Sequence, residues 1–382
     1  MTTTNPIERV ILTHLQIPFK EPFRISGGEV SRKDAILVAV ETRHAIGLGE
    51  SSPMAAGFGY SSDTPEGCWS DLTTVIAPAL LGRSVHSPSE VAELATPWRA
   101  SRFAVAGAET ALWDLLGQER HATIAELLGG ADVRIELGIE SGLAIGLYPS
   151  VVQLIQAIEA HIDAGYRRVK IKIRPGQDVE LVKAVRQHFG DLELMVDANA
   201  AYTSADIEVF RELDAFDLLM FEQPMATFDL EGSAALQRAV NTPVCLDESA
   251  ETIEQTAAAI ECGACRIVNL KIQRVGGLGP ARAIHDLCHQ HQVACWVGTM
   301  PELGIGQAHG LHLATLANCK YPSDLEPSAR WFVDDYVVPM IDLAGPGLFM
   351  LPSRPGLGYH VDAAKVRRYQ IRQQEFTTRT VA

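Results

Sequence analysis

Short apolar runs recur along the chain from about residue 134, and each is followed by a turn and an amphipathic segment. The runs have the length and β-branched character of buried strands, and the segments between them are long enough for helices. Strands that alternate with helices form parallel βαβ units, and eight such strands close into a barrel more readily than into an open sheet. The runs are IESGLAIG, RVKIKI, LELMVDAN, DLLMFEQP, PVCLDES, RIVNLKIQ, VACWVGTM and SDLEP.

A charged residue ends five of these runs at a nearly constant interval. One strand, a short loop, about three helical turns and a return loop add up to this interval. In a β/α barrel the catalytic groups lie at the C-terminal ends of the strands, so we expect the five side chains to meet at one mouth. They are Lys172, Asp197, Glu222, Asp247 and Lys271, and successive positions differ by 25, 25, 25 and 24.

The first part of the chain lacks this repeat. Residues 8–19 and 35–51 are alternating and β-branched, which predicts strands, and 102–129 form an Ala/Leu-rich helical stretch. Polar, Gly-containing segments at 20–33 and 51–67 predict two loops. After SDLEP, residues 331–352 are strand-like with Pro and Gly breaks, so no further barrel helix is expected.

These patterns predict the fold class α/β, a modified (β/α)7β TIM-like barrel with an α+β N-terminal capping domain. The capping domain is expected over 1–130, completed by about 345–382, and the barrel over 131–344. A doubly wound nucleotide-binding sheet is the alternative, and it requires a GxGxxG turn after an early strand. The glycines at 276–279 and 304–310 do not give that motif.

Composition narrows the function classes. A formal charge of −15 disfavours nucleic acid and anionic membranes as partners. The seven cysteines follow no regular frame, and Met1 is followed by neither a signal peptide nor an 18-residue apolar run. We therefore expect a reduced, cytoplasmic protein, with a homo-oligomer as the expected assembly.

Three of the five charged residues are acids on adjacent strands. Asp197, Glu222 and Asp247 can converge on one point, where unneutralised carboxylates would repel one another. A hard divalent cation resolves this repulsion, so we predict a Mg²⁺ site, with Mn²⁺ as the alternative. Helix capping explains any one of these acids, but it does not explain three at a constant interval. A zinc hydrolase would need His at these strand ends.

Lysines flank the acids on both sides. Alternation places Lys170 and Lys172 on the same inward face, where two ammonium groups are expected to lower each other's pKa and help Lys172 act as a base. Lys271 arrives from the opposite side. A small-molecule carboxylate held by the metal would lose its α-proton to one lysine, with an enediolate intermediate stabilised by the cation.

The segments KIKI, DAN, FEQP, LDES and NLKIQRVGGL, in this order, resemble the muconate-lactonising subgroup of the enolase superfamily. The resemblance implies Asp197, Glu222 and Asp247 as metal ligands and Lys172 and Lys271 as the acid/base pair. It also implies that loops around 18–30 and 50–62 close over the substrate. Lys271-x-x-Arg274, WVGTMPELGIGQAH and SDLEPSARWFVDDYV further resemble N-succinylamino acid racemases and o-succinylbenzoate synthases. Thr299 and Pro301 depart from that pattern.

Muconate cycloisomerases and dipeptide epimerases share the catalytic residues, so both activities remain alternatives. The acidic pair that marks dipeptide epimerases is not evident in residues 323–326. A catalytically inactive barrel that serves as a binding protein is the alternative from another class. The candidate substrate-binding or supporting residues are Asn199, Glu248, Arg274, Glu302, Arg24 and Tyr60.

Histidines offer a second metal reading. We expect His285, His289 and His291 to be solvated on an outer helix, and His309 and His312 to have core or capping roles.

Overall fold

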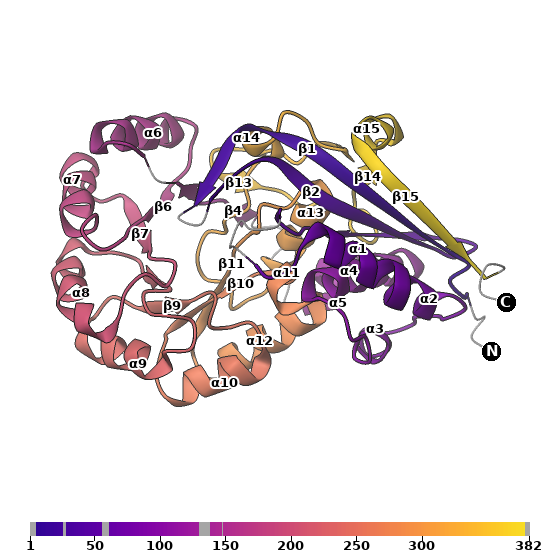
Figure 1. Ribbon diagram of the computed structural model, residues 1–382, viewed down its shortest axis with the longest axis horizontal. Coiled ribbons are helices and arrows are strands. Elements are labelled where there is room, and N and C mark those ends of the chain that lie inside the picture. The colour runs from indigo at the N-terminus through magenta and orange to yellow at the C-terminus, as the bar shows by residue number, and fades with distance from the viewer. Residues whose placement is uncertain (1–4, 26–27, 56–60, 130–137, 147, 379–382) are drawn as a thin grey trace.

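The computed structural model describes residues 5–25, 28–55, 61–129, 138–146 and 148–378, and gives only the backbone of residues 24 and 25. Two parts are evident in Figure 1: a ring of strands and helices, and a sheet with its own helices beside it. The sheet is antiparallel in the order β15-β1-β2-β3, so the end of the chain pairs with its beginning. Its strands are β1 (Arg9–Ile25), β2 (Gly28–Glu41), β3 (Ile46–Ser51) and β15 (Gln370–Thr377).

Helix α4 packs directly on strand β3 of this sheet, and glycines make the close approach possible. A Cβ atom on Gly49 would lie 2.0 Å from the carbonyl oxygen of Gly107, and one on Gly47 would lie 2.1 Å from that of Ala111. The contact fixes the end of β3, where the sheet meets the barrel. The helical elements here are α1 (Pro65–Asp71), the π-helical turn η1 (Leu72–Ile76), α2 (Ala77–Leu80), α3 (Pro88–Ala95), α4 (Arg102–Arg120) and α5 (Ile124–Gly129).

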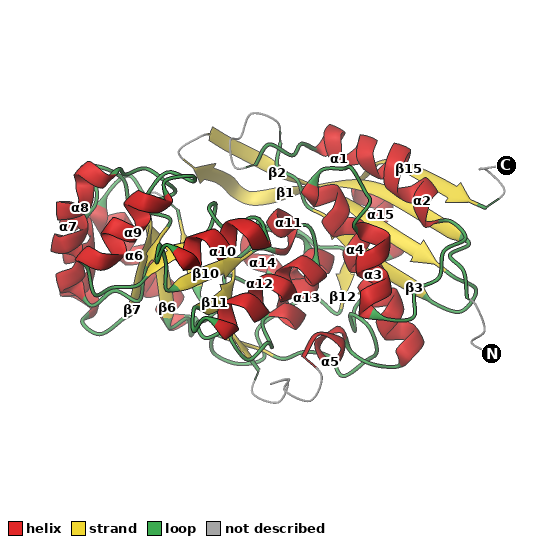
Figure 2. Ribbon diagram, turned by 90° about the horizontal axis from the view of Figure 1, so that it is seen from below, coloured by secondary structure: helices red, strands yellow, loops and turns green. Residues whose placement is uncertain are grey.

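The loop predicted over 20–33 is wrong for most of its length. Strands β1 and β2 continue through it as the two arms of a long hairpin that reaches toward the barrel (Figures 1 and 2). Aromatic contacts hold the arm extended: the Phe19 ring lies 5.1 Å from that of Phe332, and the Phe23 ring 5.5 Å from that of Trp331. The polar residues between these anchors are typical of a loop, which explains the error.

Two further boundaries differ from expectation. The strand predicted over 35–51 is two strands, β2 and β3, because the Thr42 hydroxyl accepts backbone N–H groups of the turn between them. The helix predicted over 102–129 breaks at His121, whose φ of 53° is left-handed.

The barrel sheet is parallel in the order β11-β10-β9-β8-β7-β6-β5, which confirms the predicted alternation. Figure 2 shows the helices packed outside these strands. The strands are β5 (Leu143–Ile145), β6 (Arg168–Lys172), β7 (Glu193–Asp197), β8 (Phe221–Glu222), β9 (Val244–Leu246), β10 (Ile267–Leu270) and β11 (Ala294–Val297). The helical elements are α6 (Val151–Asp163), α7 (Val179–Phe189), η4 (Ser204–Asp206), α8 (Ile207–Leu213), η5 (Asp214–Phe216), α9 (Leu230–Ala239), α10 (Ile253–Glu261), α11 (Ile272–Val275), α12 (Leu278–Gln290) and α13 (Gly304–Leu313).

Residues 319–326 close the barrel as an irregular segment rather than a full strand. The Asp324 N–H donates to the Val297 carbonyl on one side, and the Gly142 N–H donates to the Ser323 carbonyl on the other. The chain then forms α14 (Ser328–Trp331) and α15 (Ala363–Tyr369) and two short antiparallel pairs. These pairs join β12 (Val337–Val338) with β14 (His360–Val361), and β13 (Leu348–Phe349) with β4 (Ile139–Glu140).

The barrel interior holds a small apolar cluster that is separate from the main core. Met195, Met220, Cys245, Ile267 and Trp296 form it, all at most 1% exposed. The main core lies between the strands, the outer helices and the capping sheet. Side chains alternate along a strand, so a residue two positions after a member of this cluster also faces inward. Asp197, Glu222 and Asp247 follow Met195, Met220 and Cys245 by two positions, and they therefore face the C-terminal mouth of the barrel.

Candidate active site

Strand register aligns the first three predicted residues at one level of the barrel. Lys172 pairs with Asp197, and Asp197 pairs with Glu222, across neighbouring strands. The residue opposite Glu222 is Cys245, so Asp247 lies two positions further along its chain and faces the same way. Lys271 directly follows β10. The two lysines therefore lie on strands that flank the three acid-bearing strands.

On the β6–β7 side, Lys172 contacts two acceptors. Its Nζ lies 2.5 Å from Asp197 Oδ2 and 2.6 Å from Asn199 Oδ1. Asn199 adopts a left-handed backbone with φ of 42°, and its N–H donates to the second oxygen of Asp197. Side-chain exposure is 19% for Lys172, so this ammonium is partly open to solvent.

On the β9–β10 side, two cations share one carboxylate. Lys271 Nζ lies 2.8 Å from Asp247 Oδ2, and the Arg274 guanidinium contacts the other oxygen. Burial alone would raise the pKa of Asp247, but Arg274 and Lys271 outweigh it and hold the pKa below its usual value. The side chains of Lys271 and Asp247 are almost fully buried.

Glu222 lies between these two sides. Its Oε2 is 3.0 Å from Lys170 Nζ, and its Oε1 accepts a 2.8 Å hydrogen bond from Asn269. Burial, together with the negative charges of Asp197 and Asp247, raises the pKa of Glu222 to about 7 against the opposing effect of Lys170. The carboxylates are therefore close enough to repel one another.

The carboxylates point toward cationic side chains in this structure. Within the described ranges, no three His, Cys, Asp or Glu side chains are already arranged to hold a metal ion. The donor set itself fits a hard divalent cation: three carboxylates on neighbouring strand ends, with the mutual repulsion that raises the pKa of Glu222. To hold one, they would have to turn from the ammonium groups.

Lys170 belongs to a buried group of ion pairs with Arg168 and Asp324 that the sequence did not predict. Its ammonium contacts Asp324 on the closing segment, and Arg168 lies 2.8 Å from the other oxygen of Asp324. Both cations also lie over the Trp296 ring. Arg168 Cζ is 5.1 Å from the ring centroid, and Lys170 Nζ is 5.0 Å from it. The alternation Arg168-x-Lys170-x-Lys172 was the available signal, because it puts three cations on one inward face.

The predicted mutual lowering of the lysine pKa values is not found for Lys170. Burial would lower its pKa, but Asp324 and Glu222 outweigh that effect and raise the pKa well above its usual value. Lys170 therefore stays a cation, and it helps to neutralise Glu222.

The remaining candidates lie in different places. Glu248 accepts a hydrogen bond from Asn199, and burial raises its pKa. Glu302 accepts from the Met300 N–H at 2.9 Å, in the loop between β11 and α13. Tyr60 and the Arg24 side chain lie outside the described residues.

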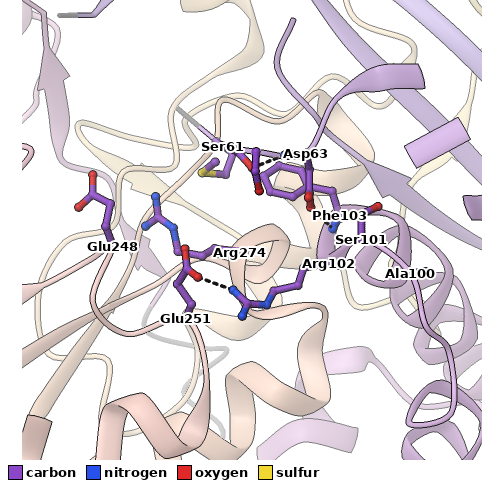
Figure 3. Close-up of a pocket in the computed structure, with 11 residues that line it drawn as sticks. Ser61, Asp63, Ala100, Ser101, Arg102, Phe103, Glu248, Glu251 and Arg274 are labelled. Carbon is purple, nitrogen blue, oxygen red and sulfur yellow. Dashed lines mark hydrogen bonds and ion pairs between the residues drawn. The ribbon is translucent and has the colours of Figure 1, made fainter. Parts of the chain in front are cut away.

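A cavity of about 330 Å³ lies between the barrel and the capping helices, and it is lined in part by Arg274, which contacts Asp247. Figure 3 shows Glu248 and Arg274 on its barrel side, and Asp63 and Arg102 on its capping side. An ion pair of 2.5 Å joins Arg102 to Glu251 across the gap. Local patterns gave no signal for this pair, because its members are far apart in the sequence.

The histidine expectations are partly confirmed. His289 and His291 are exposed, but His285 is buried, since its Nδ1 pairs with Asp286 and its Nε2 accepts the Asn318 N–H. His309 and His312 are buried on α13 and hydrogen-bond to the carbonyls of Leu48 and Leu357, which is a core role.

Comparison with known proteins agrees with this geometry. Residues 7–129 match the mandelate racemase / muconate lactonizing enzyme N-terminal domain, and residues 153–365 match the enolase C-terminal domain-like family. The chain belongs to the mandelate racemase / muconate lactonizing enzyme family of the enolase superfamily, a family of enzymes.

Individual relatives cover nearly the whole chain. An o-succinylbenzoate synthase of Geobacillus stearothermophilus is 42% identical over 95% of this chain and 96% of that protein. An N-succinylamino acid racemase of Thermus thermophilus is 36% identical over 96% and 98%. The crystal structure of an enolase superfamily member from Listeria innocua matches with a TM-score of 0.91 and 32% identity, over 98% of this chain and 99% of that one. In the described part of the chain, no helix is long and apolar enough to cross a membrane.

Proposed function

We propose that this protein removes a proton from the carbon next to a carboxylate, as an N-succinylamino acid racemase or an o-succinylbenzoate synthase. The observation that carries the proposal is the placement of Lys172 and Lys271 on strands that flank three buried carboxylates. The relatives of both activities, each similar over nearly the full chain, support it.

In the proposed mechanism, Asp197, Glu222 and Asp247 hold one Mg²⁺. When bound, the cation supplies positive charge that stabilises the negative charge developing on the substrate carboxylate. Lys172 takes or returns the proton on one face of the α-carbon, and Lys271 acts on the other. Racemisation uses both lysines, whereas elimination uses Lys172 as the base and Lys271 as a fixed positive charge.

The acids of the closing segment support an N-succinyl substrate over a dipeptide. Asp324 contacts Lys170 and Arg168, and Glu326 lies 2.5 Å from Arg330. Both carboxylates are therefore engaged by cations of the protein, which leaves them poorly placed to receive the ammonium group of a dipeptide.

The test follows α-proton exchange of N-succinyl amino acids in D₂O with Mg²⁺. If the protein is a racemase, Lys172→Ala and Lys271→Ala should each keep exchange from one enantiomer only and lose interconversion. Lys183→Ala, which changes a lysine on the outer helix α7 whose side chain is 45% exposed, is the matched control and should behave as the parent protein. Exchange from both enantiomers in Lys271→Ala would refute the assignment.

The same assay separates the alternatives. Turnover confined to muconates or dipeptides would move the activity to the cycloisomerase or epimerase class. Failure to bind Mg²⁺ at millimolar concentration would instead favour an inactive barrel that acts as a binding protein.

A further inference from the structure

Lys33 is a fully buried lysine at the junction of the capping sheet and the barrel. Its side chain is 0% exposed, although it lies on β2 within the long hairpin. Its ammonium donates to the carbonyls of Ser52 at 2.8 Å and Met300 at 3.1 Å, with longer contacts to Pro53 and Met54. It therefore joins the root of the capping loop after β3 to the barrel loop after β11.

The partners of this ammonium are carbonyl and thioether groups. Among the described residues, no carboxylate forms an ion pair with it, and Glu302, Glu50, Asp34 and Cys68 act on it only through longer-range charge. Burial lowers the pKa of Lys33 to about 8. Burying a charge without a direct counter-ion opposes folding, so the stability of the fold does not explain why a lysine occupies this position.

Met300 is held from both sides by this arrangement. Its carbonyl accepts from Lys33, and its N–H donates to Glu302 Oε2 at 2.9 Å. Met300 lines the cavity that Glu248 and Arg274 also line, and Arg274 contacts Asp247. The position of this cavity wall therefore depends on Lys33.

Ser52 connects Lys33 to the other side of the same cavity. Its N–H donates to Gln273 Oε1 at 2.9 Å, and Gln273 Nε2 donates to the Glu50 carbonyl at 2.8 Å. Gln273 is two residues after Lys271 and directly precedes Arg274 on α11. Lys33 thus connects two elements through hydrogen bonds. One is the cavity wall at Met300, and the other is the end of β3, to which Gln273 of α11 hydrogen-bonds.

We propose that Lys33 is a positioning residue. Its ammonium fixes Met300 and residues 52–54, at the start of the loop after β3, around the cavity that Glu248 and Arg274 line, which we take as the substrate-binding cavity, and it does not touch the substrate. The choice of assay substrate rests on the proposed function. The hydrogen bonds of Lys33 to Ser52 and Met300 do not depend on it.

The test compares Lys33→Met, which keeps the length and removes the charge, with Lys183→Met, which changes a lysine on the outer helix α7 whose side chain is 45% exposed. Lys33→Met should lower kcat/KM for N-succinyl substrates about tenfold, mainly through KM, because a charged hydrogen bond to the wall is lost. Mg²⁺ affinity and thermal stability should not fall, and the Met300 amide should exchange faster with solvent. Lys183→Met should change none of these.

A purely structural role predicts other results. An activity loss that tracks a lower melting temperature at unchanged KM would overturn the proposal, as would unchanged KM and unchanged Met300 exchange. If Lys33→Met does not fold, the parent protein still provides the test: its KM should rise as pH passes about 8. A flat KM from about pH 7 to 9.5 would also overturn it. If no N-succinyl substrate turns over, the proposed function fails, while Met300 exchange still decides the positioning role.

Discussion

The two sides of the barrel mouth look equivalent in the sequence and differ in the structure. Lys172 is partly open to solvent beside the neutral amide of Asn199, whereas Lys271 is buried beside the Arg274 guanidinium. The buried side is also where the capping sheet docks, through Gln273. Equal spacing along the chain therefore places two lysines in unequal surroundings, and the Lys271 side is coupled to the capping domain through Gln273.

The largest expected effect comes from removing the carboxylate on the buried side. Asp247→Asn should abolish turnover and Mg²⁺ binding, and it should remove the charge of the buried carboxylate that Lys271 and Arg274 share, at a cost of about 3 kcal/mol. Asp197→Asn should also abolish turnover but destabilise less, because Lys172 is near solvent and Lys170 keeps Asp324. Urea unfolding and calorimetric Mg²⁺ titration measure both. Equal destabilisation would contradict the asymmetry.

Low pH should destabilise the contact between the barrel and the capping domain near Lys271 before the rest of the molecule. Burial lowers the pKa of His309 to about 3 and of His312 to about 4, both below the ordinary 6.5. The unfolded chain therefore binds these protons more readily, so stability present above about pH 6.5 is lost as pH falls toward 4, by about 3 kcal/mol per histidine at most. His312→Gln should flatten this loss.

Hydrogen exchange locates the acid effect. At about pH 5 the amides of α11 should lose more protection than those of β7, because α11 docks on β3, whose Leu48 carbonyl binds His309. Equal loss in α11 and β7, or no loss in the parent protein, would count against an acid-sensitive junction.

Arg274→Met tests whether the two lysines depend differently on their surroundings during proton exchange. It removes the cation that shares Asp247 with Lys271, so exchange of the enantiomer served by Lys271 should fall about tenfold or more. Exchange of the other enantiomer should fall less. Deuterium incorporation into each enantiomer gives the ratio, and an unchanged ratio would show that Arg274 acts on both sides alike.

Asn199→Gly should have the smallest effect. Glycine accepts the left-handed backbone at this position, so the substitution removes the amide without adding strain. A hydrogen bond to a partly exposed ammonium contributes about 1 kcal/mol, so the rate of proton exchange by Lys172 should fall roughly fivefold. Racemisation rates in both directions test this, and a thousandfold loss would point to direct substrate contact.

The repeat was the most predictive feature of the sequence. It placed Lys172, Asp197 and Glu222 in register because parallel strands of equal spacing must align. It did not show that Asp247 lies two positions beyond that register, since strand starts depend on the packing of each helix. The domain limits and the roles of the site residues stay predictions.

Partners that are distant in sequence escaped the prediction. Asp324 meets Lys170 and Arg168 only after the barrel closes, and Lys33 meets Met300 only after the capping sheet docks. A polar run such as 20–33 gives no local sign of the aromatic anchors that extend it, and the contacts that bury His285 are not visible in a helical pattern.

The two hydrogen bonds of the Gln273 amide have a consequence for protein engineering. This side chain belongs to the barrel, directly precedes Arg274, and hydrogen-bonds to the backbone at the end of the capping strand β3. A chimera that joined this barrel to a capping domain from a relative would therefore separate Gln273 from the strand end to which it hydrogen-bonds. Residues 50–52 and the helix at 272–275 should be exchanged together, as a single transferable unit.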